Sequence, residues 1–122
     1  MKILIAEDDE VMLTLIKHQL TKEGHSINAN SDARKALQSM ETFKPDMIIT
    51  DIVMPFTSGL ELIGIVRSSG IKIPILVLSA MDEEATVLEA LSLGADDFIT
   101  KPFNTSEFSM RVKRLLRQKE KK

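Results

Sequence analysis

The stretch MIITDIVMP, residues 47–55, carries the strongest fold signal in the chain. Its first four residues are almost wholly apolar, which is typical of a strand buried on both faces of a parallel sheet. The run ends at Asp51, and placing an aspartate beside a core costs free energy unless something uses its charge. The stretch therefore predicts a central strand with a functional carboxylate at its C-terminal end.

Outward from this stretch, short β-type runs alternate with amphipathic helical stretches. We expect strands at 2–6, 25–29, 47–50, 73–80 and 97–100, helices at 9–22, 59–68 and 83–93, and two more helices opened by Ser31 or Asp32 and by a capping box at Asn104–Glu107. Two apolar strands separated by helices indicate a parallel sheet covered on both sides, with right-handed crossovers. The pattern predicts an open, doubly wound α/β domain.

The composition is that of a globular protein, with 43% hydrophobic and 28% charged residues among 122. No apolar run approaches the roughly 20 residues that span a bilayer, and Met1 and Lys2 lead directly into a strand, so we expect neither a membrane segment nor a secretory signal. Cysteine is absent, which excludes disulfides and thiolate chemistry. We expect one domain over residues 1–122, in the cytoplasm.

Charge is unevenly distributed along the chain. Residues 111–122 carry seven Lys or Arg and one Glu, whereas the whole chain has a net charge of −2. Such a segment is either a nucleic-acid patch or a solvated helix end whose cations suit the helix dipole. We favour the helix end, since the basic residues are not interleaved with aromatic ones, and we expect no direct nucleic-acid binding by this domain.

Polar side chains stand at or just beyond the C-terminal ends of four of the expected strands. In an open parallel sheet, ligands bind beyond the carboxyl ends of the strands, where the strand order reverses. The side chains delivered to this edge are Glu7, Asp8 and Asp9, then Asp51, then Ser79, and then Thr100 and Lys101. Helix capping would explain Asp8 or Asp9 alone, but Asp51 is followed by IVMP rather than by a helix start. Their joint occurrence therefore predicts a functional site.

The carboxylates in this set favour metal-assisted phosphoryl chemistry. If the first and third strands are neighbours, Asp8 and Asp51 repel each other and must either take up a proton or recruit a cation. Oxygen ligands without Cys or a nearby His favour Mg²⁺, which in turn suits a phosphoryl group. Asp51 would be the nucleophile, and Lys101 and Ser79 would contact phosphoryl oxygens.

The same residues carry a family resemblance. ILIAEDD, MIITDIVMPFTSG, ILVLSA and GADDFITKPF, in this order and spacing, resemble the receiver domain of two-component response regulators over about residues 2–118. The resemblance implies a flavodoxin-like fold with strand order 2-1-3-4-5. It also implies phosphorylation of an aspartate by a sensor histidine kinase or a phosphotransfer protein, and control of an output domain or a protein partner.

Carried over by position, the resemblance assigns the metal site. Glu7 and Asp8 are the acidic pair that holds Mg²⁺, and Asp51 is the phosphoacceptor and a metal ligand. The backbone carbonyl of Val53 is a further ligand. Asp9 falls outside the acidic pair and is expected to start the first helix.

The resemblance also assigns a switch. Ser79 is the hydroxyl that moves toward the phosphoryl group, Phe98 is the switch aromatic, and Lys101 is the phosphoryl-binding lysine, joined to Pro102 by a cis peptide. Ser79 stands where threonine is commoner. Phe98 stands where tyrosine is common, so this switch makes no hydroxyl hydrogen bond.

The output face is ambiguous in the sequence. Relatives that are transcription factors often dimerise through the helix at 83–93, the strand at 97–100 and the last helix, using salt bridges, one of which Asp97 and Arg111 could supply. The helix at 83–93 has no Lys or Arg, so Glu107 lacks a basic partner there. The alternatives are a homodimer and a basic protein partner. The sequence also leaves open a stand-alone receiver or a piece of a larger, possibly DNA-binding, regulator.

Two alternative functions belong to other classes of protein. A phosphatase with an aspartyl-phosphate intermediate would want a second carboxylate two residues after Asp51, where Val53 stands. A flavodoxin-like carrier would need a phosphate-binding loop where Glu7, Asp8 and Asp9 repel phosphate. We expect no enzyme beyond self-catalysed phosphotransfer and slow self-dephosphorylation, since the apolar Val53 and Met81 flank the expected path of the water.

Overall fold

The computed structural model describes residues 1–54, 58–80 and 84–120. In chain order its elements are β1 (Lys2–Ala6), α1 (Glu10–Lys22), β2 (Ser26–Asn30), α2 (Ala33–Phe43), β3 (Met47–Asp51), α3 (Gly59–Ser68), β4 (Ile75–Ser79), α4 (Glu84–Leu93), β5 (Asp97–Thr100) and α5 (Thr105–Glu120). The described helices are all too short or too polar to cross a membrane.

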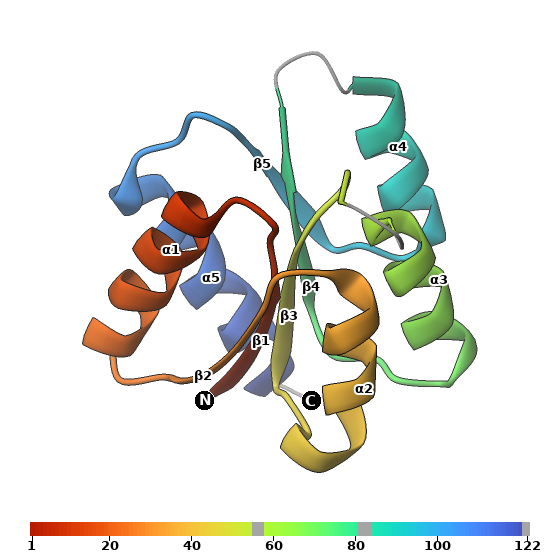
Figure 1. Ribbon diagram of the computed structural model, residues 1–122, viewed down its shortest axis with the longest axis horizontal. Helices are drawn as coiled ribbons and strands as arrows, with labels where there is room; N and C mark the ends of the chain where they lie inside the picture. Colours follow the sequence, from red (N-terminus) through yellow and green to blue (C-terminus); the bar gives the residue numbers. More distant parts are fainter. Residues whose placement is uncertain (55–57, 81–83, 121–122) are drawn as a thin grey trace.

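The five strands form one parallel sheet in the order β2-β1-β3-β4-β5. The helices α1 and α5 cover one face, and α2, α3 and α4 cover the other (Figure 1). This arrangement confirms the predicted doubly wound, flavodoxin-like fold. The strand order reverses between β1 and β3, so the C-terminal ends of these two strands border the crevice where such sheets bind ligands.

The central strands are buried because helices cover both sides of the sheet. Every residue of β3 and β4 is buried, and successive side chains point to opposite faces. Ile48 packs into the cluster under α2, α3 and α4, whereas Ile49 packs into the cluster under α1 and α5. The edge strand β5 instead alternates, with Ile99 buried and Phe98 exposed.

Capping residues set the helix ends as predicted. The carboxylate of Asp9 accepts hydrogen bonds from the first turn of α1, and Asp32 rather than Ser31 caps α2. At α5, Asn104 Oδ1 accepts a hydrogen bond of 2.7 Å from the backbone amide of Glu107. These caps supply acceptors for backbone amides that have no partner within the helix.

The strand bounds differ slightly from the prediction. β4 begins at Ile75 rather than at residue 73, because Pro74 has no amide hydrogen to donate to the sheet. β2 runs one residue later than expected, from Ser26 to Asn30. β3 extends to Asp51, so the carboxylate lies on the last residue of the strand.

Candidate functional site

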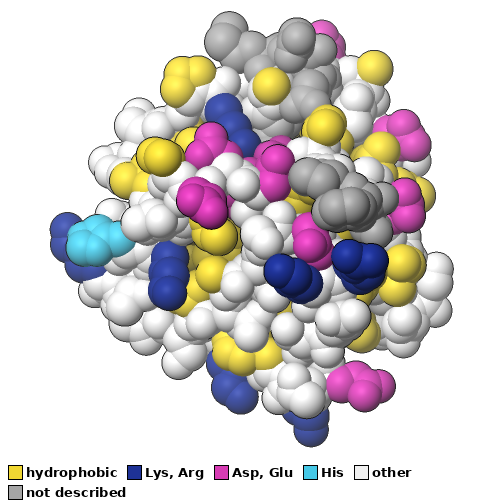
Figure 2. All heavy atoms as spheres, in the orientation of Figure 1, with side chains coloured by type: hydrophobic (Ala, Val, Ile, Leu, Met, Phe, Trp, Pro, Cys, Tyr) yellow, Lys and Arg dark blue, Asp and Glu magenta, His cyan; other side chains and the backbone are white. Residues whose placement is uncertain are grey.

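Three carboxylates meet at the C-terminal ends of β1 and β3. Ala6 pairs with Thr50 in the sheet. This pairing brings the residues that follow them in the chain, Glu7 and Asp51, side by side. One carboxylate oxygen from each of Glu7, Asp8 and Asp51 lies within 4.8 Å of the others. Figure 2 shows acidic side chains gathered over this end of the sheet, beside a basic one. The structure thus assembles the acidic cluster that the sequence predicts.

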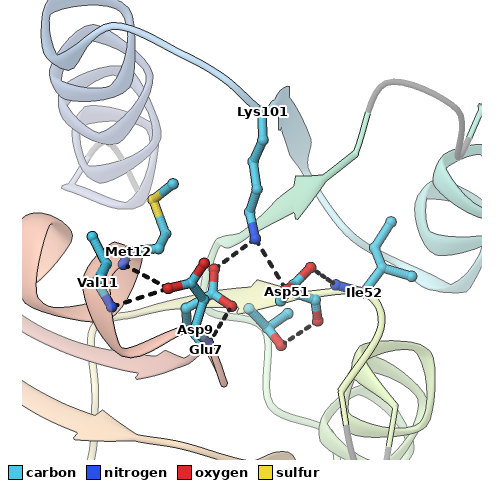
Figure 3. A network of polar contacts seen from close by, with 8 residues as sticks. Glu7, Asp9, Val11, Met12, Asp51, Ile52 and Lys101 are labelled. Carbon is cyan, nitrogen blue, oxygen red and sulfur yellow. Dashed lines mark hydrogen bonds and ion pairs between the residues drawn. The ribbon is translucent and has the colours of Figure 1, made fainter.

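Lys101 reaches this cluster from the end of β5. Its Nζ donates hydrogen bonds to Glu7 Oε1 at 2.7 Å and to Asp51 Oδ2 at 3.1 Å (Figure 3). Its backbone amide donates to Ser79 O at 2.7 Å, and the peptide to Pro102 is cis, as predicted. Burial by itself would lower the pKa of Lys101, but the hydrogen bonds to Glu7 and Asp51 raise it above the usual value, so the ammonium stays charged.

The carboxylate of Asp51 has a fixed orientation. Its Oδ1 accepts a hydrogen bond of 2.8 Å from the backbone amide of Ile52, while Oδ2 faces Lys101 (Figure 3). Asp9 lies outside the cluster, as expected, because its Oδ1 accepts from the amides of Val11 and Met12 at 3.0 and 3.2 Å. One oxygen of Asp51 is therefore anchored to the backbone, and the other faces the cluster.

Glu7 is electrostatically unusual. Its side chain is fully buried, and burial raises its pKa to about 7, assisted by the adjacent Asp51 carboxylate and opposed by Lys101. A buried carboxyl beside a second carboxylate must either hold a proton or gain a cation. Glu7 thus holds its proton up to near neutral pH in the metal-free protein.

The cluster fits a hard divalent cation. When ionised, Glu7, Asp8 and Asp51 carry three negative charges, and Lys101 supplies one positive charge. The remaining two charges match a divalent ion, and oxygen-only ligands suit Mg²⁺ or Ca²⁺ better than zinc. The donor set is therefore one that could bind a metal.

The two residues predicted to form the switch lie together beside α4. Ser79 is the last residue of β4, and its buried Oγ has no hydrogen-bond partner among the described residues. Ser79 and Phe98 line the same cavity, of about 280 Å³, together with Glu84, Val87 and Leu88 of α4. The hydroxyl of Ser79 and the aromatic ring of Phe98 thus border one space between the sheet and α4.

Other predicted features are placed less completely. The side chain of Val53, predicted to flank the path of the hydrolytic water, is 61% exposed. Met81, predicted to flank the path of water, lies outside the described residues, as do the predicted acidic residues Asp82 and Glu83. Asp97, predicted to supply a salt bridge between subunits, contacts Arg111 of its own chain at 3.0 Å.

Two residues next to Asp51 were missed by the sequence reasoning. Thr50 Oγ1 donates a hydrogen bond of 2.9 Å to the backbone carbonyl of Asp51, and Gly59 packs directly on that carbonyl. The available signals were a buried polar residue within an apolar strand and a glycine at the first position of a helix. Neither signal shows by itself which atom the residue contacts.

The face formed by α4, β5 and α5 combines apolar and charged residues. Leu88, Phe98 and Met110 are 61%, 36% and 53% exposed. The described part of α4 carries Glu84 and Glu89 and no Lys or Arg. This face is therefore acidic along α4, with exposed apolar side chains on all three elements.

Comparisons with known proteins agree with this geometry. The family model for the response regulator receiver domain matches residues 3–113. The alkaline phosphatase synthesis transcriptional regulatory protein PhoP of Bacillus subtilis is 41% identical over 119 residues, which are 98% of this chain and 50% of that protein. The virulence transcriptional regulatory protein PhoP of Salmonella choleraesuis is 40% identical over 118 residues, 97% of this chain and 53% of that protein. The chain spans about half the length of these curated relatives.

Solved structures give the same result. The receiver domain of the Francisella response regulator 1452 is 34% identical, with a TM-score of 0.88, and the match covers 96% of this chain and 97% of that chain. NtrX from Brucella abortus is 26% identical with a TM-score of 0.92, over 98% of this chain and 27% of that one. With its sheet order, its acidic cluster and these relatives, the chain belongs to the receiver domain family of two-component response regulators, a family of signalling modules rather than of enzymes that turn over a substrate.

Proposed function

We propose that Asp51 accepts a phosphoryl group from a sensor histidine kinase or a phosphotransfer protein, in a reaction that needs Mg²⁺. The observation that carries this proposal is the orientation of Asp51. Its Oδ1 is held by the Ile52 amide, and its Oδ2 faces Lys101 within a cluster of three carboxylates. A carboxylate fixed by one oxygen presents the other as an oriented nucleophile.

In the proposed phosphoryl transfer, one bond to phosphorus forms as another breaks. Asp51 Oδ2 forms a new bond to phosphorus while the phosphorus–nitrogen bond of the donor phosphohistidine breaks, and the departing imidazole nitrogen takes a proton. Lys101 then pairs with a phosphoryl oxygen. The hydroxyl of Ser79, which has no hydrogen-bond partner in the described part of the chain, donates a hydrogen bond to another. Glu7, Asp8, Asp51 and the carbonyl of Val53 would hold Mg²⁺, which neutralises charge between the carboxylate and the phosphoryl oxygens.

The same chemistry supplies a signal. The phosphoryl group leaves up to about two negative charges at Asp51, which draw Ser79 and Lys101 toward it. Movement of Ser79 frees space in the cavity that it shares with Phe98, so the ring turns inward and the face of α4, β5 and α5 changes. That face then binds an output domain, a protein partner or a second copy of the chain. Its acidic α4 favours a basic partner surface.

Two further expectations belong to this proposal. Residues 1–122 form one cytoplasmic receiver domain, in which 111–122 are the basic end of the last helix and a tail, and this domain acts alone or within a longer regulator. The two PhoP relatives are named as transcriptional regulatory proteins, which supports a gene-regulatory output for such a regulator. The apolar Val53 and Met81 predict slow self-dephosphorylation, whereas a lifetime of seconds for the phosphorylated protein would argue against it.

The proposal is tested by intact mass after incubation with acetyl phosphate and Mg²⁺. We expect one phosphoryl adduct in the wild type, and none in Asp51→Asn or with a chelator. Asp9→Asn is the matched control, since Asp9 is the adjacent carboxylate outside the cluster and asparagine keeps its capping role. An adduct that persists in Asp51→Asn would reject Asp51 as the phosphoacceptor, and no adduct in the wild type would reject the function.

A further inference from the structure

The backbone carbonyl of Asp51 is enclosed by two residues that have no part in the proposed phosphoryl chemistry. From β3, Thr50 Oγ1 donates a hydrogen bond to it at 2.9 Å, and Thr50 is fully buried. From the start of α3, Gly59 approaches so closely that a Cβ atom there would lie 2.0 Å from the carbonyl oxygen. The carbonyl is thus held by a hydroxyl and by the bare Cα of a glycine.

The glycine is required by space and not by backbone conformation. Gly24, Gly70 and Gly94 have positive φ angles, which favour glycine, but Gly59 does not. A Cβ on Gly59 would also lie 3.0 Å from Ile52 Cα, so it would press on both sides of the peptide that follows Asp51. Gly59 is therefore the point where α3 contacts the phosphoacceptor backbone.

The enclosed peptide carries the group that orients the phosphoacceptor. The amide of Ile52 belongs to the same peptide unit as the Asp51 carbonyl, and it donates to Asp51 Oδ1 at 2.8 Å (Figure 3). The next carbonyl, Ile52 O, accepts a hydrogen bond of 2.8 Å from the Gly59 amide. A shift of this peptide therefore moves the amide that holds one carboxylate oxygen and changes where the other oxygen points.

We propose that Gly59 and Thr50 are positioning residues for phosphoryl transfer, which fix the Asp51–Ile52 peptide and through it the aim of the Asp51 carboxylate. This inference rests on the proposed function of Asp51. Neither residue touches the reacting atoms. Both act on the carbonyl of the peptide whose amide orients the nucleophile.

The displacement caused by a single methyl group can be bounded. Real Cβ atoms essentially never lie within 3.0 Å of such an atom, so Gly59→Ala must separate α3 from the Asp51 carbonyl by at least 1.0 Å. A misplacement of about 1 Å at a reacting group can slow a reaction by roughly 100-fold. We expect acetyl phosphate to phosphorylate Gly59→Ala at least about 10-fold more slowly than the wild type.

Gly64→Ala is the matched control. Gly64 lies in the same helix, and a Cβ there meets nothing within 4 Å. This variant should be phosphorylated at the wild-type rate. Both variants are measured at a temperature at which circular dichroism shows them fully folded, so that lost stability cannot account for a slower rate.

A spectroscopic measurement separates positioning from simple destabilisation. In ¹H–¹⁵N spectra, the Ile52 amide proton reports its hydrogen bonds to Asp51 Oδ1, at 2.8 Å, and to Leu78 O of the neighbouring strand, at 3.2 Å. We expect its resonance to move in Gly59→Ala and to stay in place in Gly64→Ala, while amides at the far end of β3 remain unchanged. A wild-type Ile52 resonance and a wild-type rate in folded Gly59→Ala would overturn the inference.

Thr50 gives a second test that leaves the helix contact intact. Thr50→Val removes the hydroxyl with little change of shape, and Thr50→Ser restores it. We expect slower phosphorylation in Thr50→Val and recovery in Thr50→Ser, whereas equal rates in the two variants would reject the role of Thr50. If the wild type itself forms no adduct, the proposed function fails. If the wild type reacts and these variants react equally fast, only the positioning role fails.

Discussion

In the metal-free protein, the buried carboxyl of Glu7 should make stability fall as pH rises. Its pKa is about 7 in the folded chain, against an ordinary value of 4.5, so between these values the folded state binds more protons than the unfolded state. The free energy of unfolding therefore decreases as pH rises through this window. The full loss, caused by ionisation of the buried Glu7, is reached above pH 7. The shift corresponds to about 3 kcal/mol, of which roughly 2 to 3 kcal/mol develops between pH 5 and pH 8.

Urea unfolding followed by far-UV circular dichroism measures this effect, since the chain has no Trp or Tyr for fluorescence. Glu7→Gln keeps an acceptor for Lys101 but cannot ionise, so its stability should lack this decrease. His25 contributes in the opposite direction, because burial lowers its pKa, and the comparison of the two proteins cancels that contribution. An equal decrease in Glu7→Gln would refute the reasoning. Mg²⁺ should restore stability most strongly above pH 7, where Glu7 is ionised.

Three further substitutions test the scaffold. Phe108 lies on α5, and its side chain is 1% exposed within the apolar cluster between the sheet and α1 and α5. Phe108→Ala leaves a cavity there and should lower the free energy of unfolding by about 3 to 5 kcal/mol in urea titrations. Asp9→Ala removes the cap of α1 and should cost about 1 kcal/mol by the same assay, with adduct formation unchanged. Arg67→Ala removes the hydrogen bond to Gly94 O at 3.0 Å and leaves that carbonyl without this donor, so it should lower the free energy of unfolding by about 1 to 3 kcal/mol in urea titrations. Unchanged stability would contradict the assigned contact.

The fold could be predicted from the sequence because the controlling signals are local. Apolar runs such as 47–50 identify buried parallel strands, and caps such as Asp9 and Asn104 locate the helix starts. The acidic cluster could also be predicted from the sequence, because parallel strands end at the same edge of the sheet and the residues at their C-terminal ends therefore lie together. Asp51 and Lys101 are 50 residues apart in the chain, and this rule brings them together.

What the sequence did not predict depends on close approach between elements. The contact of Gly59 with the Asp51 carbonyl depends on the angle at which α3 meets β3, which no hydrophobic period encodes. Likewise, Asp97 contacts Arg111 and Arg114 of its own chain, and the sequence did not predict these contacts within the chain. Where a side chain has several possible partners, the packing of the helices and strands decides which of them it contacts, and this packing is not visible in the sequence.

The arrangement around Lys101 links the resting site to the proposed switch. In the resting structure its ammonium is shared, at 2.7 Å from Glu7 and 3.1 Å from Asp51, so it already contacts the group that would be modified. Phosphorylation replaces the single charge of Asp51 by up to about two, which makes Asp51 the stronger partner. Lys101 then needs only a small movement to transfer its main contact from Glu7 to the phosphoryl group. The backbone amide of Lys101 donates a hydrogen bond to Ser79 O, so this movement is coupled to the end of β4, where the hydroxyl of the proposed switch residue Ser79 lies.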